Sequence, residues 1–192
     1  MVAGFVVGSY GWLVGARSFT EQLPQMFYSA IKIPMLLAVT VCISMPFFFV
    51  ANTLMGLRND FRDAFRAIIL AQAGLSIILC SLVPFLILVY ASVTNRGYGS
   101  AVLFNAFLFG VASLSAQILL RVHYRPLIHK DRRHRFMVWA WIIVYAFVGI
   151  QVGWTARPFI GNTSAKITFF RDEPFSNAYM QMIRLARDAA GL

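Results

Sequence analysis

Residues 33–57 read IPMLLAVTVCISMPFFFVANTLMGL, a stretch that contains no charged side chain. A helix that crosses the hydrocarbon core of a bilayer needs about 20 mostly apolar residues. The few hydroxyl and amide side chains in this stretch do not offset the contribution of its Leu, Ile, Val and Phe residues. The stretch therefore predicts a membrane-spanning α-helix.

Three further stretches have the same character. They cover residues 67–92, 98–120 and 136–156. Each Leu, Ile, Phe or Val near the centre of a span favours insertion by roughly 0.3–0.6 kcal/mol, so isolated Asn and Gln residues do not cancel the sum. We therefore predict an all-α fold, an integral membrane helical bundle with four transmembrane helices in a single membrane domain, residues 1–192.

The composition agrees with this reading. Hydrophobic residues make up 59% of the chain and charged residues 12%, whereas a typical soluble domain carries about 25% charged residues. A net charge of +10 would point to nucleic acid in a soluble protein. Here the basic residues lie in short segments between apolar stretches, where they face anionic headgroups. We predict no nucleic-acid binding, and Cys42 and Cys80 lie inside apolar stretches, where no disulfide is expected.

Residues 1–16 are apolar but too short for a full crossing. We expect a short re-entrant or half-inserted helix that packs on the bundle, with a short fifth span as the alternative. Small residues four positions apart let helices approach closely. The residues expected to make such contacts are Gly4, Gly8, Gly11 and Gly15.

Basic residues are unevenly distributed among the connecting segments. Loops 58–66 and 121–135 lie on one side of a four-span bundle, whereas Arg17, Lys32 and Arg96 lie in connecting segments on the other side. The positive-inside rule places the two loops in the cytoplasm. The side chains expected to meet anionic lipid headgroups or a partner are Arg121, Arg125, Lys130, Arg132, Arg133 and Arg135.

Residues 157–192 are expected to form a tail on the opposite, periplasmic side. Arg157 and Pro158 should end the fourth helix, because proline cannot continue a helix and restricts the residue before it. From Asn177 onward, apolar residues recur at helical spacing, which predicts a C-terminal interfacial amphipathic helix.

The distribution of acidic and histidine residues predicts no catalytic, metal or cofactor site. All seven acidic residues fall outside the four predicted spans, whereas ionisable groups within the membrane mark ion and proton pathways. This pattern argues against a proton-coupled transporter or a carboxylate intramembrane protease. His123, His129 and His134 lie in the basic loop, where we expect solvated side chains rather than a metal or haem site. We predict no catalytic residue, no metal site and no cofactor.

Polar side chains within the spans have two readings. Interhelical hydrogen bonding is the common use of such residues, and we expect Asn105 and Gln117 to serve in helix–helix packing. The alternative is that Asn52, Asn105 and Gln117 line a pore.

Three segments carry a resemblance to other proteins. They are KIPMLLAVTVCISMPFFFVANTLMG (32–56), FVGIQVGWTARPFIGN (147–162) and TFFRDE (168–173). The chain resembles a group of uncharacterised bacterial polytopic inner-membrane proteins, which share a Lys-x-Pro start to the first full span, an Arg-Pro-Phe-x-Gly end to the last, and a Phe-Phe-Arg tail. The resemblance implies no activity. It implies a bacterial inner-membrane origin and a structured tail.

These observations favour a non-catalytic integral membrane subunit, either a scaffold or an accessory component of a larger membrane assembly, or a small homo-oligomer. Its expected partners are membrane lipids with anionic headgroups and other membrane subunits or copies of itself. One alternative is a homo-oligomeric channel or passive transporter. Another is a membrane protein that binds anionic lipids through the basic loop.

Overall fold

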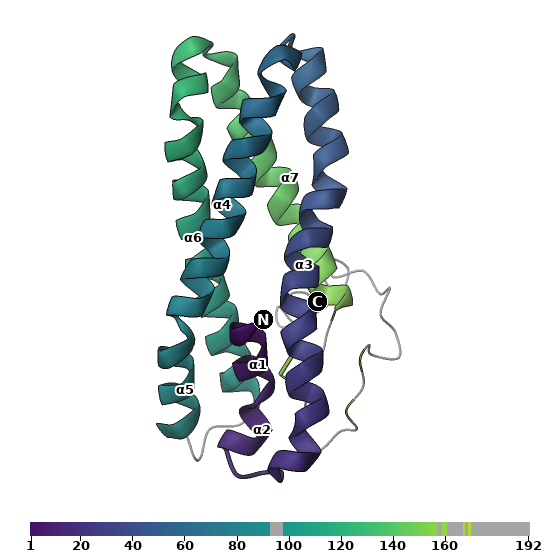
Figure 1. The fold of residues 1–192 in the computed structure, drawn as a ribbon, viewed down its shortest axis with the longest axis vertical. Helices are drawn as coiled ribbons and strands as arrows, with labels where there is room; N and C mark the ends of the chain where they lie inside the picture. The colour runs from purple at the N-terminus through teal and green to yellow at the C-terminus, as the bar shows by residue number, and fades with distance from the viewer. Residues whose placement is uncertain (93–97, 157–158, 161–166, 168, 170–192) are drawn as a thin grey trace, which may run out of the picture.

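The computed structural model describes residues 1–92, 98–156, 159–160, 167 and 169. All secondary structure in this part of the chain is helical, and four helices are long and apolar enough to cross a membrane. The chain is thus a multi-pass membrane protein of the all-α class (Figure 1). In chain order the elements are α1 Val2–Gly8, α2 Tyr10–Leu13, α3 Phe19–Leu54, the 3₁₀-helix η1 Arg58–Asp60, α4 Phe61–Ser81, α5 Val83–Ser92, α6 Tyr98–Lys130 and α7 Arg133–Thr155.

The first long helix, α3, begins well before the predicted start at residue 33. Ser18 caps it, because its hydroxyl accepts a hydrogen bond from the backbone N–H of Glu21, 3.4 Å away, while the Glu21 carboxylate accepts one from the backbone N–H of Ser18. This reciprocal capping box satisfies two of the N–H groups that a helix start leaves without partners. Lys32 therefore lies inside a helix and not in a connecting segment, which corrects the sequence-based prediction.

The helix α3 ends at a glycine turn. Gly56 adopts a φ of 75°, which L side chains rarely tolerate, and the N–H of Leu57 donates to the carbonyl of Asn52 at 2.8 Å. This 6→1 hydrogen bond is the Schellman arrangement that satisfies the last carbonyls of a helix. The chain then passes through η1 into α4.

The second span is divided at Leu82 into α4 and α5. Pro84 explains the division, because it has no N–H to donate to the carbonyl of Cys80 and its ring crowds that turn. The hydrogen bond from Leu86 to the Leu82 carbonyl, at 3.1 Å, then carries the chain into α5.

The predicted loop 121–135 is wrong as a loop. Helix α6 continues to Lys130, and only Asp131 and Arg132 separate it from α7. Arg, Lys and His side chains do not oppose helix formation, so the helix extends past the end of its apolar part. Asp131 fixes the short connection by accepting a hydrogen bond from the backbone N–H of Arg133 at 2.8 Å.

The four spans pack as two close pairs. Helix α4 lies along α6, and α3 lies along α7 (Figure 1). Small residues bring α4 and α6 together, since Ala67 and Ala71 of α4 and Ala112 and Ala116 of α6 are all buried. Close backbone approach of this kind is how helices associate in lipid, where the hydrophobic effect between them is absent.

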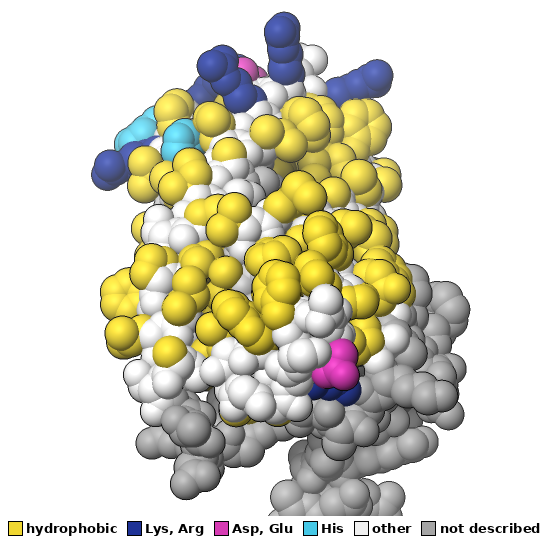
Figure 2. All heavy atoms as spheres, turned by 60° about the horizontal axis from the view of Figure 1, so that its bottom comes forward, with side chains coloured by type: hydrophobic (Ala, Val, Ile, Leu, Met, Phe, Trp, Pro, Cys, Tyr) yellow, Lys and Arg dark blue, Asp and Glu magenta, His cyan; other side chains and the backbone are white. Residues whose placement is uncertain are grey.

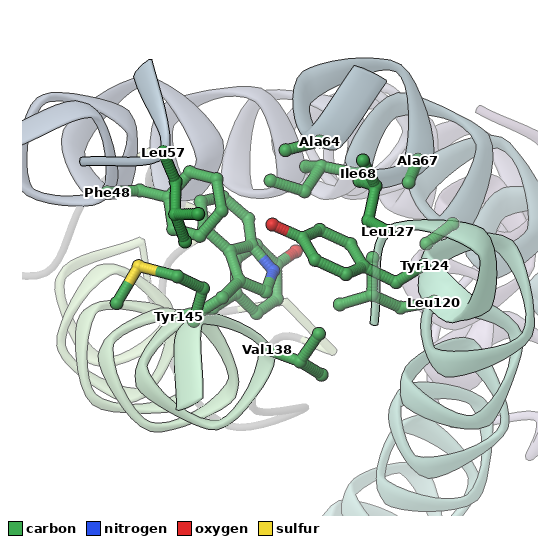
Figure 3. Close-up of a cluster of buried hydrophobic side chains, with 13 residues drawn as sticks. Phe48, Leu57, Ala64, Ala67, Ile68, Leu120, Tyr124, Leu127, Val138 and Tyr145 are labelled. Atoms are coloured by element: carbon green, nitrogen blue, oxygen red, sulfur yellow. The ribbon is translucent and has the colours of Figure 1, made fainter. Parts of the chain in front are cut away.

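A cluster of large side chains joins the two pairs near one end. Trp141 of α7 packs edge-to-face on Phe48 of α3, with ring centroids 5.2 Å apart, and Tyr124 of α6 enters the same cluster (Figure 3). Leu57 and Ile68 complete the contact from the α3–α4 side. The two pairs are therefore held to each other at this end.

The N-terminal helix α1 lies between α3 and α5 in the other half of the molecule. It runs toward the end at which α3 starts, and α2 continues to that end (Figure 1). A Cβ on Gly8 would come within 2.7 Å of the Cα of Met26 in α3, and one on Gly4 would meet the backbone of Ser29 and Ala30. Gly11 faces the side chain of Gln22. Gly15 instead lies in the turn before α3 with a φ of 74° and nothing within 4 Å of its Cβ position, so it makes no helix contact.

Lys and Arg side chains gather at one end of the described molecule, above a broad hydrophobic surface (Figure 2). The connections after α3 and after α6 both lie at this end, which we call the basic end. The predicted amphipathic helix from Asn177 lies outside the described residues.

Candidate functional site

One face of α3 carries a buried polar stripe. It runs along the inner side of a helix whose outer side is apolar, with Phe27, Ile43 and Phe47 about half exposed. A charged or amide side chain inside a membrane helix is a functional-site candidate by default, because it is costly there. The members of the stripe, each at most 2% exposed, are Gln22, Gln25, Ser29, Lys32, Thr40, Ser44 and Asn52.

Lys32 is the ionisable member of the stripe, and its side chain is completely buried. Its ammonium nitrogen lies 4.9 Å from the ring centroid of Phe169 and 6.0 Å from that of Phe159. A cation over an aromatic face is attracted by the negative charge density of the ring, and the attraction is larger away from water. The buried charge therefore connects α3 to Phe159 and Phe169.

Gln25 and Ser29 hold the same segment. The Gln25 amide donates to the carbonyl oxygen of Phe159 at 2.9 Å, and the Ser29 hydroxyl donates to that oxygen as well. Gln22, one turn earlier, donates to the carbonyl of Gly8 in α1 at 2.7 Å. The lower part of the polar stripe thus binds α1 and Phe159 to α3.

The upper part of the stripe behaves differently. Thr40 and Asn52 donate to carbonyls of their own helix, those of Leu36 at 2.7 Å and Phe48 at 2.8 Å. The Oγ atom of Ser44 and the Oδ1 atom of Asn52 have no hydrogen-bond partner among the described atoms. These residues therefore do not connect α3 to another helix by hydrogen bonds.

A second cluster of ionisable groups lies at the basic end. Asp60, at the start of α4, forms an ion pair with Lys130 of α6, and its other oxygen lies 3.2 Å from Nε2 of His134 in α7. The ring of His134 contacts that of Tyr124 edge-to-face at 5.7 Å. One carboxylate thus joins the starts of two helices and the end of a third.

His134 corrects a prediction from the sequence. It was expected to be a solvated member of a basic loop, but its side chain is fully buried and paired with Asp60. His123 and His129 are exposed, as a solvated position requires. His134 lies on the buried side of the first turn of α7, whereas the neighbouring Arg residues are exposed. The sequence around His134 therefore looks like an exposed basic segment.

The Asp60 cluster gives a testable difference between its two partners, His134 and Lys130. His134→Ala removes a fully buried ring and a buried hydrogen bond, for which we expect a loss of about 2–4 kcal/mol in the free energy of unfolding. Lys130→Ala removes a partner whose side chain is 64% exposed, and because exposed ion pairs contribute little in water, a much smaller loss is expected. Thermal unfolding of both variants in the same detergent measures the difference. Equal losses would show that burial does not set the strength of this cluster.

The basic residues predicted to act together are distributed over α6, α7 and the short connection between them. Arg121 stacks over the Trp139 ring at 4.5 Å, and Arg133 donates to the carbonyl of Met55 at 3.2 Å. Lys130 pairs with Asp60. Arg125, Arg132 and Arg135 are exposed.

The two amides singled out in the spans occupy different surroundings. Asn105 donates to the hydroxyl of Tyr90 in α5 and to the Ala101 carbonyl at 2.7 Å. Gln117 lies three turns further along α6 and is partly buried. A hydrogen bond between α4 and α7 comes from Tyr145, which donates to Gln72 at 3.1 Å.

Within the described residues, no group of three or more His, Cys, Asp or Glu side chains is placed to hold a metal ion. The arrangement of Lys32 and Asp60 is that of groups which join segments of one chain. Comparison of the chain with protein-family models, with curated proteins and with solved structures finds no match.

Proposed function

We propose that this chain is a non-catalytic integral membrane subunit, a scaffold or accessory component of a larger membrane assembly. The observation that supports the proposal is that the buried ionisable groups contact other segments of the same chain. Lys32 lies against two phenylalanine rings and Asp60 between Lys130 and His134. Both groups hold segments of the chain together, which is what a rigid structural component requires.

The outer face of α6 supports the proposal and indicates where a partner would pack. Only 11% of the apolar span of α6 is buried within the molecule, against 28% for α3. Its large exposed side chains recur every three or four residues. This spacing places them on one face of the helix, against which a neighbouring helix can pack. The side chains of this face are Leu103, Phe107, Val111, Leu114, Ile118 and Val122.

The positive-inside rule supports a further part of the proposal, the orientation in the membrane. Both basic connections lie at one end of the molecule, and a cytoplasmic position for that end satisfies the rule. The resemblance noted for residues 32–56 and 147–162 favours a bacterial inner membrane. The tail after α7 would then begin on the periplasmic side.

Cross-linking in native membranes tests the subunit proposal. In a background of Cys42→Ala and Cys80→Ala, a single Leu114→Cys on the α6 face should form an adduct of one fixed mass with a membrane protein. Ile77→Cys on α4 is the matched control, because Ile77 is 67% exposed and Leu114 68%. We expect a yield at Leu114 at least several times that at Ile77.

The mass of the adduct identifies the partner. Twice the mass of the chain means a second copy, and any other fixed mass means a different subunit. Equal yields at the two positions, a ladder of unrelated adducts, or no adduct at either position would contradict the proposal. A monomer that elutes alone in mild detergent from native membranes would also count against it.

A further inference from the structure

A recess of about 310 Å³ lies between α4 and α6 at the basic end. Its volume is at the lower end of the range of about 300–1,000 Å³ that small-molecule sites occupy. Four of its residues come from α4 and three from α6. They are Asp63, Arg66, Ala67, Leu70, His123, Pro126 and Leu127.

The recess has an apolar part and a polar part. Ala67 and Leu127 are buried, and Leu70 and Pro126 add apolar surface that remains accessible. Arg66 and His123 are both exposed and stand on opposite sides of it, one on each helix. The Nδ1 atom of His123 lies 2.9 Å from the carbonyl oxygen of Leu119, so this nitrogen is used within α6.

The charges around the recess favour an anion. Arg62 precedes Arg66 by four residues and so lies on the same face of α4, one turn nearer the helix start. The one acidic residue lining the recess, Asp63, lies within electrostatic reach of the Lys130 ammonium. Arg62 and Arg66 together outnumber Asp63 at this end of α4, so the guanidinium of Arg66 presents a positive charge to a ligand.

The position of the recess identifies the kind of anion. Arg66 lies in the second turn of α4, where the helix changes from charged to apolar residues, and Leu70 is one turn further into the apolar part. A phosphate beside an apolar groove at this depth is the geometry of a phospholipid at the membrane interface. A free phosphate ion would use the guanidinium but would leave the apolar surface in contact with lipid.

We propose that this recess binds one anionic phospholipid. Its phosphate lies against the guanidinium of Arg66, and an acyl chain follows the accessible surface of Leu70 toward the apolar part of α4. The proposal is independent of the subunit proposal above, since the recess lies between α4 and α6 and not on the outer face of α6.

Native mass spectrometry of the full chain in detergent, titrated with phosphatidylglycerol, tests the charge requirement. The chain should retain one phosphatidylglycerol more tightly than phosphatidylcholine with the same acyl chains. Arg66→Gln should weaken that binding by about tenfold, a loss of one charge-assisted contact. Arg135→Gln removes an exposed arginine at the same end outside the recess, and it should change the affinity less than about twofold. Equal weakening by both variants would mean diffuse attraction to the basic end and would overturn the proposal.

A second pair of variants tests the shape requirement without changing charge. Leu70→Trp fills the apolar part of the recess and should abolish the tight lipid. Ile69→Trp is the control, since Ile69 is 44% exposed and Leu70 42%, but only Leu70 lines the recess. Glycerol phosphate added in excess should not displace the lipid, and displacement would identify a soluble phosphate as the ligand. Retention of the lipid by Leu70→Trp would also contradict the proposal.

Discussion

Replacing Gly4 with leucine is expected to detach α1 from the bundle. A Cβ at this position would come within 2.7 Å of the Cα of Ala30 and closer still to the Ser29 carbonyl oxygen. These are backbone atoms of a long helix, so α1 must move away. We expect a loss of about 3 kcal/mol or more in the free energy of unfolding, at the upper end of overpacking effects. Loss of α1 would also expose Gln22, whose amide donates to the Gly8 carbonyl.

Thermal unfolding in detergent and protease protection of the N-terminus measure this effect. Gly110→Leu in α6 is the control, because nothing lies within 4 Å of a Cβ there and leucine favours a helix over glycine by roughly 0.8 kcal/mol. The control should unfold at the same temperature as the unsubstituted chain or slightly above it. An unchanged stability of Gly4→Leu would mean that α1 does not pack against α3 as described.

Reversing the charge of Lys32 is the second substitution with a large expected effect. Lys32→Glu places a carboxylate in a fully buried position facing the rings of Phe159 and Phe169. The negative faces of the rings attract a cation and repel an anion. With the cost of a charge in the apolar interior added, we expect a loss of about 3–5 kcal/mol. The yield of folded protein should fall with it.

Lys32→Arg separates the role of charge from that of burial. Arginine keeps the positive charge and stacks on aromatic faces, so this variant should lose far less stability than Lys32→Glu. Fluorescence-detected size-exclusion chromatography after a heating series compares the two. Similar behaviour of the Arg and Glu variants would show that Phe159 and Phe169 do not recognise a cation.

The number and order of the spans could be predicted from hydropathy, because length and apolarity alone decide whether a helix suits a bilayer. Hydropathy alone does not give the helix boundaries. The uncharged stretch begins at residue 33, directly after Lys32. The capping pair Ser18 and Glu21 instead places the start of the helix at Phe19. That pair is visible in the sequence as a Ser-x-x-Glu motif, so attention to caps would have included Lys32 in the helix.

The pairing at the basic end could not be read from the sequence. Asp60 and His134 are far apart in the chain, and each lies in a segment crowded with arginine. Nothing local marks them as different from the exposed residues beside them. Their proximity follows from the antiparallel packing of the spans, which brings the α3–α4 turn to the α6–α7 turn. The four-residue spacing of Gly4 and Gly8 predicts that they pack against a helix. That this helix is α3 is known only from the structure.

The length of α3 sets a condition on the membrane that can accommodate this protein. Exposed apolar side chains recur along α3 between Phe27 and Leu54, a distance of about 40 Å at 1.5 Å per residue. A typical hydrocarbon core is about 30 Å thick, and hydrophobic mismatch is relieved by helix tilt or by local thickening of the lipid. Tilt alone would need about 40°, the limit of the observed range. The protein should therefore partition into the thicker regions of a bilayer of mixed composition and stretch the lipid chains around it elsewhere.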